Sequence, residues 1–128
     1  MTGVQTCALP ILLGVEDGDG SNDAGWMAKK LSNLRIFCDD DGKMNHSILD
    51  VQGELLLVSQ FTLVADCSQG NRPSFIRASK PDIAEPLVKE VGILLQQYGV
   101  PVKTGLFGAS MRVDIENDGP VTIVLKQD

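Results

Sequence analysis

The run Leu55-Leu56-Leu57-Val58, which follows Glu54, constrains the fold of this chain more than any other segment. Successive side chains of a strand point to opposite faces, so a strand that is apolar at every position must be covered on both faces. Polarity returns abruptly at Ser59 and Gln60. In α/β sheets, ligands collect at the carboxyl ends of strands. The run therefore predicts a central strand with a binding or catalytic site at its end.

The rest of the chain predicts helices and further strands around this one. A buried strand is expected at 11–15, ended by the turn-forming residues 17–20. Ser21 or Asn22 can cap a first helix. Its apolar positions recur with a helical period, at Ala24, Met27, Ala28, Leu31 and Leu34.

A second helix is expected to open at Pro81 and to end at Gly99, with a kink or a late start caused by Pro86. Its expected buried stripe is Ala84, Leu87, Val88, Val91, Leu94, Leu95 and Tyr98. Short strands are predicted at 35–38, at 111–115 and at 121–125. At 128 residues the chain is one domain. The predicted fold is an α/β domain in which two helices pack on a mixed, curved, barrel-like sheet.

Composition excludes several classes of function. No apolar stretch reaches the ~20 residues that span a bilayer, so no membrane partner is expected. Three dispersed cysteines without a Cys-x-x-Cys pair favour reduced thiols in a cytoplasmic protein. The net charge of −6 argues against DNA as a partner and against an extensive grip on any nucleic acid.

The sequence also gives little support for a metal site or for a Ser-His-Asp catalytic triad. Asp17, Asp19 and Ser21 begin like a calcium loop, but Asn22 replaces the turn glycine and Ala28 the closing glutamate. The acidic turn at 39–42 departs from the calcium-loop pattern at an earlier position of the loop. His46 is the only histidine, and no Gly-x-Ser-x-Gly elbow accompanies it. No metal and no cofactor is predicted.

Two polar segments remain as candidate functional sites. Residues 71–80 carry the three cations Arg72, Arg77 and Lys80 and no acid, which indicates either a local phosphate-binding patch or a solvated basic loop. The turn Asn117-Asp118-Gly119-Pro120 contains a proline, and proline tolerates a cis peptide at a cost of about 0.5–1 kcal/mol. Such a turn can push two bare main-chain carbonyls outward. Taken alone, the motif is better explained as an ordinary hairpin turn.

Several motifs together resemble the D-aminoacyl-tRNA deacylase family. Ser59-Gln60-Phe61-Thr62-Leu63 is followed by Arg72-Pro73-Ser74-Phe75, by residues 104–111 (Thr-Gly-Leu-Phe-Gly-Ala-Ser-Met) and by residues 117–122 (Asn-Asp-Gly-Pro-Val-Thr), in the family's order and at compatible spacing. The resemblance runs from about Ile11 to Lys126.

The resemblance implies a cytoplasmic homodimer that hydrolyses the ester joining a D-amino acid, or mischarged glycine, to the 3′ end of tRNA. Ser59, Gln60, Phe61 and Thr62 would form the catalytic pocket around the terminal adenosine. Thr62 is the obvious nucleophile, but no base is evident beside it, so water assisted by the RNA 2′-hydroxyl is preferred.

The same resemblance implies a role for the turn that contains Gly119 and Pro120. Gly119 and Pro120, together with Asn117, would form a Gly-cisPro element that reaches into the partner protomer and rejects L-aminoacyl groups sterically. Local charge, and not the resemblance, suggests that Arg72, Arg77 and Lys80 contact phosphates of the acceptor end.

The match to the family breaks at the N-terminus. Residues 1–10 resemble nothing in the family and are interpreted as a non-native leader, such as a translated sequencing adapter. Residues 11–128 would then be a single deacylase-like domain that lacks its first strands. A genuine divergent terminus is the alternative. Besides an editing hydrolase, a non-catalytic module that binds the tRNA acceptor end and an inactive fragment remain open.

Overall fold

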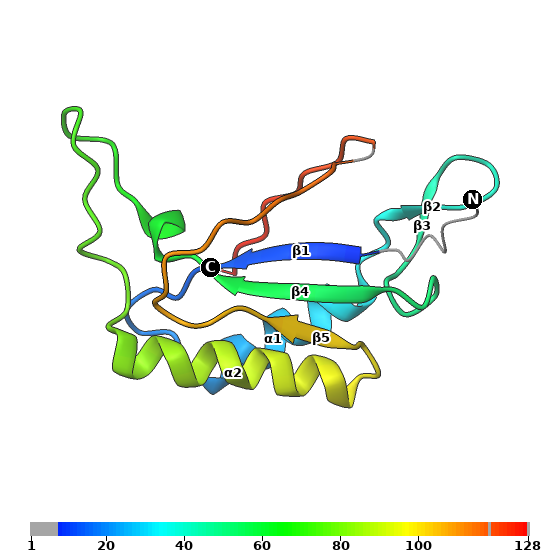
Figure 1. Ribbon diagram of the computed structural model, residues 1–128, viewed down its shortest axis with the longest axis horizontal. Helices are drawn as coiled ribbons and strands as arrows, with labels where there is room; N and C mark the ends of the chain where they lie inside the picture. The colour runs from blue at the N-terminus through cyan, green and yellow to red at the C-terminus, as the bar shows by residue number, and fades with distance from the viewer. Residues whose placement is uncertain (1–7, 118, 128) are drawn as a thin grey trace.

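The computed structural model describes residues 8–117 and 119–127. Figure 1 shows an open parallel sheet with two long helices along one side. The elements, in chain order, are β1 (Ala8–Leu13), α1 (Ser21–Asn33), β2 (Phe37–Cys38), β3 (Met44–His46), β4 (Glu54–Ser59), the 3₁₀ helix η1 (Phe61–Val64), α2 (Pro81–Gln97) and β5 (Val102–Thr104). The predicted α/β class with two packed helices is confirmed.

The main sheet has the order β1-β4-β5, and both of its pairings are parallel. β4 is the middle strand, as its continuous apolar run predicts. Leu13 pairs with Ser59, and Leu57 pairs with Thr104. Because the strands are parallel, their carboxyl ends meet at one edge of the sheet.

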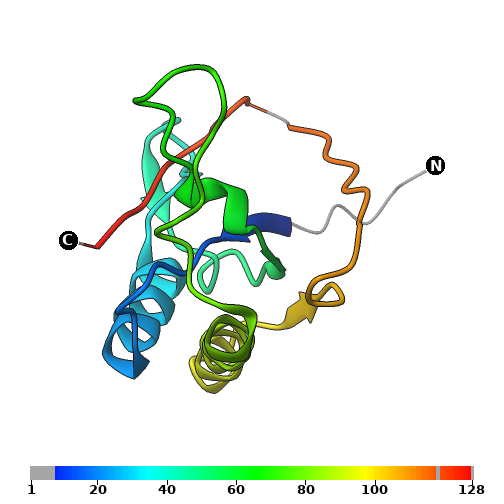
Figure 2. The same cartoon turned by 90° about the vertical axis from the view of Figure 1, so that its left-hand side faces the viewer.

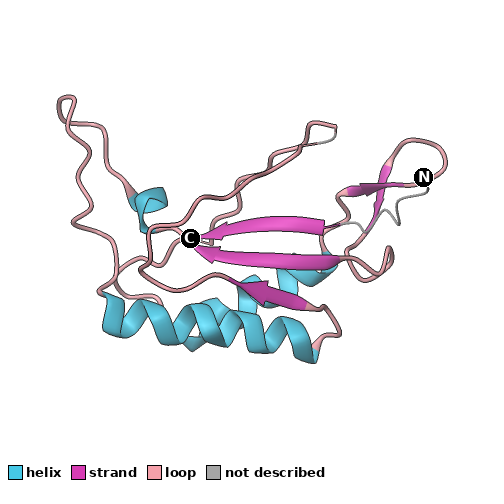
Figure 3. Ribbon diagram, viewed as in Figure 1, coloured by secondary structure: helices cyan, strands magenta, loops and turns pink. Residues whose placement is uncertain are grey.

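The two faces of β4 have different coverings. Leu55 and Leu57, each 1% exposed, point toward the helices and belong to the main core. Leu56 and Val58 point to the opposite face, where residues from 105 onward cross the sheet. Figure 3 shows α1 and α2 together on a single side of the three strands. The buried apolar core therefore lies between the sheet and this helical layer.

The first helix begins slightly differently from the prediction. Gly20 is its N-cap, and the Asp23 carboxylate accepts the Gly20 main-chain N–H at 2.9 Å. Ser21 is the first residue of the helix, so neither Ser21 nor Asn22 caps it. An acidic side chain inside the first turn satisfies the free N–H group and matches the helix dipole. Ala24, Ala28 and Leu31 are buried as predicted.

The second helix opens at Pro81, and the late start considered for Pro86 is wrong. Helical geometry continues through Pro86, which lies on the exposed side. Gly99 ends the helix with φ +99°, and its N–H donates to the Gln96 carbonyl while the Val100 N–H donates to Leu95. These two bonds form a Schellman motif, which explains why a glycine is needed there.

The predicted strands at 111–115 and 121–125 are not formed. Residues 105–117 and 119–127, called the arm below, contain no strand. Within the described residues, no main-chain hydrogen bond joins the two limbs of the arm. Val124 is 92% exposed, and Ile115 and Ile123 are each 51% exposed. Alternation alone does not make a strand, because strand geometry also needs a neighbour that pairs its backbone. A barrel-like closure is accordingly not seen in the described part of the chain.

The beginning of the chain and the small hairpin complete the picture. β1 starts at Ala8, three residues before the strand expected from Ile11, and residues 1–7 lie outside the described part. β2 and β3 form an antiparallel pair apart from the main sheet. No helix in the described part of the chain is long and apolar enough to cross a bilayer.

Candidate functional site

The carboxyl edge of the sheet carries the Ser59–Thr62 motif. The Gln60 main-chain N–H donates to the Leu13 carbonyl oxygen at 2.8 Å, which extends the β1–β4 pairing by one bond. The chain then turns sharply, because the Leu63 N–H donates back to the Gln60 carbonyl at 3.2 Å and starts η1. The predicted placement of this motif at the end of the central strand is confirmed by the geometry.

Gln60 and Thr62 are joined through their side chains. The Gln60 Nε2 donates to the Thr62 Oγ1. Across the described residues, the structure records no hydrogen bond between the Thr62 hydroxyl and a carboxylate or an imidazole. The Thr62 oxygen thus accepts a hydrogen bond, and among the described residues no base is recorded beside it that could remove the hydroxyl proton. The main-chain N–H groups of Phe61 and Thr62 have no recorded acceptor among the described residues.

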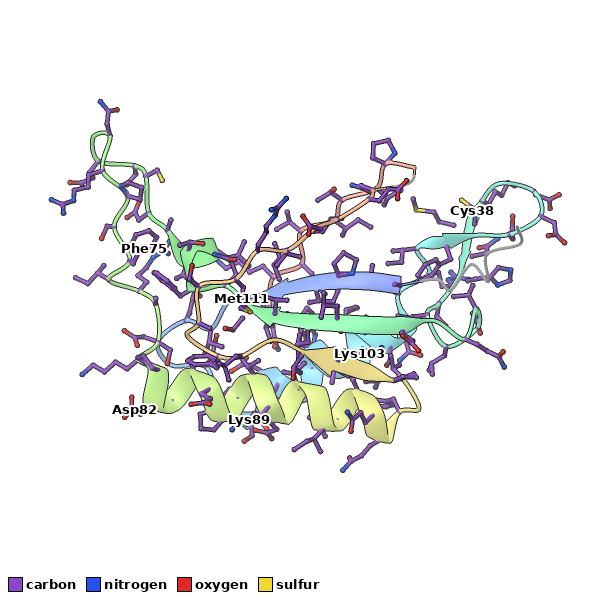
Figure 4. The ribbon with its side chains drawn as sticks, viewed as in Figure 1. Cys38, Phe75, Asp82, Lys89, Lys103 and Met111 are labelled. Carbon is purple, nitrogen blue, oxygen red and sulfur yellow. The ribbon has the colours of Figure 1, made fainter. Side chains whose placement is uncertain are left out.

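An aromatic pair lies beside this turn. The rings of Phe61 and Phe75 meet edge to face, with centroids 5.2 Å apart and planes at 70°. Phe61 is 59% exposed, which is a large exposed fraction for an aromatic side chain held by a neighbour. Figure 4 shows Phe75 at the base of the long loop that follows η1. The pair forms an apolar platform next to the polar Gln60–Thr62 pair.

The loop after η1 closes on itself and is also bonded to the segment that follows β1. Asp66 and Ser74 exchange both main-chain hydrogen bonds, at 2.7 and 2.9 Å, and close a hairpin between them. Further on, the Ser79 N–H donates to the Val15 carbonyl at 2.9 Å. The Asp66 carboxylate accepts the Ser68 N–H, and hydrogen bonding by Ser68 lowers the pKa of Asp66. The loop is therefore fixed at its base, and its tip projects into solvent in Figure 2.

The three predicted phosphate-binding cations differ in their surroundings. Arg72 and Lys80 are exposed. Arg77 lies on the anchored part of the loop, and its Nη1 is 3.9 Å from Glu16 Oε1. The Lys126 Nζ approaches the same carboxylate oxygen at 4.0 Å. Sequence reasoning treated the loop as free of acids, but the fold brings Glu16 to it from 61 positions earlier in the chain.

A groove of about 300 Å³ lies on the face of the sheet opposite the helices. It is lined by Leu56, Val58, Gly105, Met111, Arg112, Val113 and Asp114. Met111 packs directly over Gly105, where an added Cβ would lie 2.5 Å from the Met111 sulfur. Figure 4 places Met111 close to the carboxyl ends of the strands. Sequence reasoning missed this groove because it assigned residues 111–115 to a paired strand.

The Asn117–Pro120 turn lies elsewhere. The Gly119–Pro120 peptide bond is cis, as predicted. The Asn117 Oδ1 accepts the Val121 N–H at 3.4 Å, and the Asn117 Nδ2 donates to the Thr122 Oγ1 at 3.5 Å. Figure 1 shows this turn at the tip of the arm, well away from η1 of the same chain. A single chain therefore brings together residues 59–62 and Phe75 of the loop, but not Gly119 and Pro120.

The acidic turn between β2 and β3 is closed by its own hydrogen bonds. The Asp39 carboxylate accepts the N–H groups of Asp41 and Lys43 and the Asn45 side-chain amide. These bonds, led by the one from Asn45, lower the pKa of Asp39. Among the described residues, no group of three or more His, Cys, Asp or Glu side chains is arranged to hold a metal ion.

These features define an α/β protein whose polar turn, aromatic platform and basic loop gather at the carboxyl edge of a parallel sheet. A family model described as D-Tyr-tRNA(Tyr) deacylase matches residues 2–126. The chain belongs to this family.

Curated relatives support the same placement. The D-aminoacyl-tRNA deacylase of Parabacteroides distasonis is 53% identical over 121 residues, which are 91% of this chain and 79% of the relative. The Bifidobacterium longum enzyme of the same name is 56% identical over 90% of this chain and 71% of its own length. The Thermus aquaticus enzyme is 48% identical over 98% of this chain and 82% of its own length.

A solved structure also shares the fold. The structure titled c-Myc DNA Unwinding Element Binding Protein superposes with a TM-score of 0.85 at 41% identity. The match covers 93% of this chain and 81% of that one.

Proposed function

We propose that this protein hydrolyses the ester bond of D-aminoacyl-tRNA, and of mischarged glycyl-tRNA, releasing free tRNA and the amino acid. The observation that carries the proposal is the intact Ser59–Thr62 turn at the carboxyl edge of the sheet, in a chain that is 53% identical to a curated D-aminoacyl-tRNA deacylase. The activity is a proofreading step in translation, which takes place in the cytoplasm.

The hydrogen bonding of the turn favours water over Thr62 as the attacking group. A nucleophilic hydroxyl needs a base that removes its proton. The Thr62 oxygen instead accepts the Gln60 amide, and an amide is not a base. The adenosine 2′-hydroxyl, adjacent to the ester, is the group that assists the water. The step needs no metal and no cofactor.

The unpaired main-chain donors supply the electrostatic part of the mechanism. Attack on the ester carbonyl makes a tetrahedral oxyanion, and N–H groups aimed at that oxygen lower the barrier. The N–H groups of Phe61 and Thr62 have no recorded acceptor within the described residues. Because they belong to one short turn fixed by the Gln60–Leu13 bond, their direction is set before the substrate arrives. We assign Ser59, the last residue of β4, to the same site.

Substrate binding uses the apolar platform and the basic loop. A base that stacks on an exposed aromatic ring gains roughly 1–3 kcal/mol, and Phe61 offers such a ring. Arg72, Arg77 and Lys80 face the acceptor-end phosphates. With a net charge of −6, the protein holds only a small part of the tRNA, so these few local cations make the phosphate contacts.

The proposed active form is a homodimer in which Asn117, Gly119 and Pro120 enter the partner's site. Two observations support this arrangement: the turn lies away from its own η1, and the arm exposes apolar side chains that a second copy can cover. In the partner's pocket, the main chain of Gly119 and Pro120 fills the space that an L side chain would need. Backbone atoms cannot rotate away, so the selection is steric.

The direct test is incubation with D-Tyr-tRNA, L-Tyr-tRNA and Gly-tRNA, with release of the amino acid followed over time. Loss of the D and glycyl esters with the L ester retained supports the proposal. Binding of tRNA without ester loss would instead identify a non-catalytic acceptor-end module. A protein that neither binds tRNA nor releases the amino acid would be an inactive chain. Sedimentation of the same sample reports whether it is dimeric.

A further inference from the structure

Gly14, which follows β1, lies directly against the turn that carries Gln60. A Cβ added at Gly14 would lie 3.2 Å from the Gln60 carbonyl oxygen, 3.2 Å from the Leu63 Cβ and 3.3 Å from the Val64 Cγ2. Contacts of this length are tighter than ordinary van der Waals contact. Two of the three atoms are fixed to the main chain of the turn, so they can yield only if the turn itself moves.

The neighbours of Gly14 hold both halves of the site. On one side, the Leu13 carbonyl accepts the Gln60 N–H at 2.8 Å. On the other side, the Val15 carbonyl accepts the Ser79 N–H at 2.9 Å, which anchors the end of the basic loop. Residues 13–15 therefore connect the polar turn to the basic loop through main-chain hydrogen bonds. Gly14 is the residue of this segment at which an added side chain would meet the turn.

We propose that Gly14 is a positioning residue: its missing side chain lets the Gln60 turn sit close enough to β1 for the N–H groups of Phe61 and Thr62 to face the substrate ester. The inference rests on the proposed function for the identity of that ester. It concerns space and not backbone strain, because Gly14 has no positive φ. Small displacements matter here, since a shift of ~1 Å in a catalytic group can cost about 100-fold in rate.

The test compares Gly14→Ala with Gly92→Ala. Gly92 is also buried, but a Cβ there would meet its nearest atoms at 3.6 and 3.9 Å, which is ordinary contact, and it lies on α2 outside the site. We expect Gly14→Ala to lower kcat for D-aminoacyl-tRNA about tenfold with KM changed less than twofold. Gly92→Ala should keep the wild-type kcat. A Gly14→Ala enzyme with kcat within twofold of wild type overturns the inference.

The Val64→Ala background separates positioning from simple crowding. Removing the Val64 Cγ2 relieves the one contact that belongs to a side-chain tip, and it also makes room should Gly14→Ala alone fail to fold. We expect Gly14→Ala to lower kcat about tenfold in this background too, because the Gln60 carbonyl still meets the methyl group. Equal kcat for the double variant and for Val64→Ala would show that packing against Val64 was the whole effect, and would overturn the inference.

A readout without substrate keeps this inference distinct from the proposed function. The Gln60 N–H, bonded to Leu13, should change its ¹⁵N chemical shift and exchange faster in Gly14→Ala but not in Gly92→Ala. If the wild type releases no amino acid from any D-aminoacyl-tRNA, the proposed function fails, while this measurement still decides whether Gly14 sets the position of the turn. An unchanged Gln60 amide in Gly14→Ala overturns the inference.

Discussion

Replacement of Thr62 by valine distinguishes an orienting threonine from a nucleophilic one. Valine has nearly the same shape, so the change removes the hydroxyl and little else. In the structure, that hydroxyl accepts one hydrogen bond, from the Gln60 amide. A net neutral hydrogen bond contributes about 0.5–1.5 kcal/mol. Since about 1.4 kcal/mol corresponds to a factor of ten in rate, the orienting role predicts a loss of roughly 2- to 13-fold.

A nucleophilic role predicts a much larger loss. Removal of a catalytic nucleophile costs roughly 10⁴-fold or more, because no other group can form the covalent intermediate. The two roles therefore differ by about three orders of magnitude. For the orienting role, we expect the loss of rate to lie at the low end of the 2- to 13-fold range, because the Gln60–Thr62 pair is exposed and water can replace the lost acceptor.

The assay is single-turnover release of a D-amino acid from tRNA by the Thr62→Val and Thr62→Ser enzymes. We expect both to stay within about 13-fold of the wild type. A tRNA that ends in 2′-deoxyadenosine and carries the amino acid on its 3′ oxygen should instead lose about 100-fold or more with the wild-type enzyme, because it lacks the assisting hydroxyl. A loss above 10³-fold in Thr62→Val, with activity kept in Thr62→Ser, would refute the reasoning and make Thr62 the nucleophile.

Two further predictions concern the basic loop and the second helix. Replacing Arg72, Arg77 and Lys80 together by alanine should weaken tRNA binding and reduce the slope of log Kd against log salt by up to about 2. Filter binding at several salt concentrations measures this slope, and an unchanged slope contradicts the assignment of the three cations to phosphate contacts. Pro86→Ala should raise the free energy of unfolding by about 1–3 kcal/mol, because Pro86 is exposed in a helix interior and alanine restores a donor. Urea melts test this against Pro81→Ala, which should gain nothing since proline suits the first helical position; equal effects at both positions would show that the helical location does not matter.

Local patterns predicted the elements that need only their own residues. Apolar residues at every position made β4 a central strand, and helical spacing placed Ala24, Ala28 and Leu31 in the core. Gly99 was assigned to the end of α2 because the left-handed backbone there disfavours a side chain. The site at the carboxyl end of β4 followed from the same logic, since polarity begins where the apolar run stops.

Predictions failed where a residue depends on a distant partner. The alternating residues 111–115 and 121–125 have the period of a strand but no neighbour that pairs their backbone in the described part of the chain. Arg77 looked unopposed in its own segment, yet the fold sets Glu16 beside it. Tyr98, expected in the buried stripe of α2, is 45% exposed because the helix ends there and the chain turns away.

The sequence by itself determined the class of fold, the position of the central strand and the motif of the site, because periodicity and turn chemistry are properties of neighbouring residues. Only the tertiary structure decided which groups surround that motif. It brought Phe75 to Phe61, and it pressed Gly14 against the Gln60 carbonyl. Such contacts join segments that chain folding, and not local propensity, brings together, so no pattern within one segment can specify them.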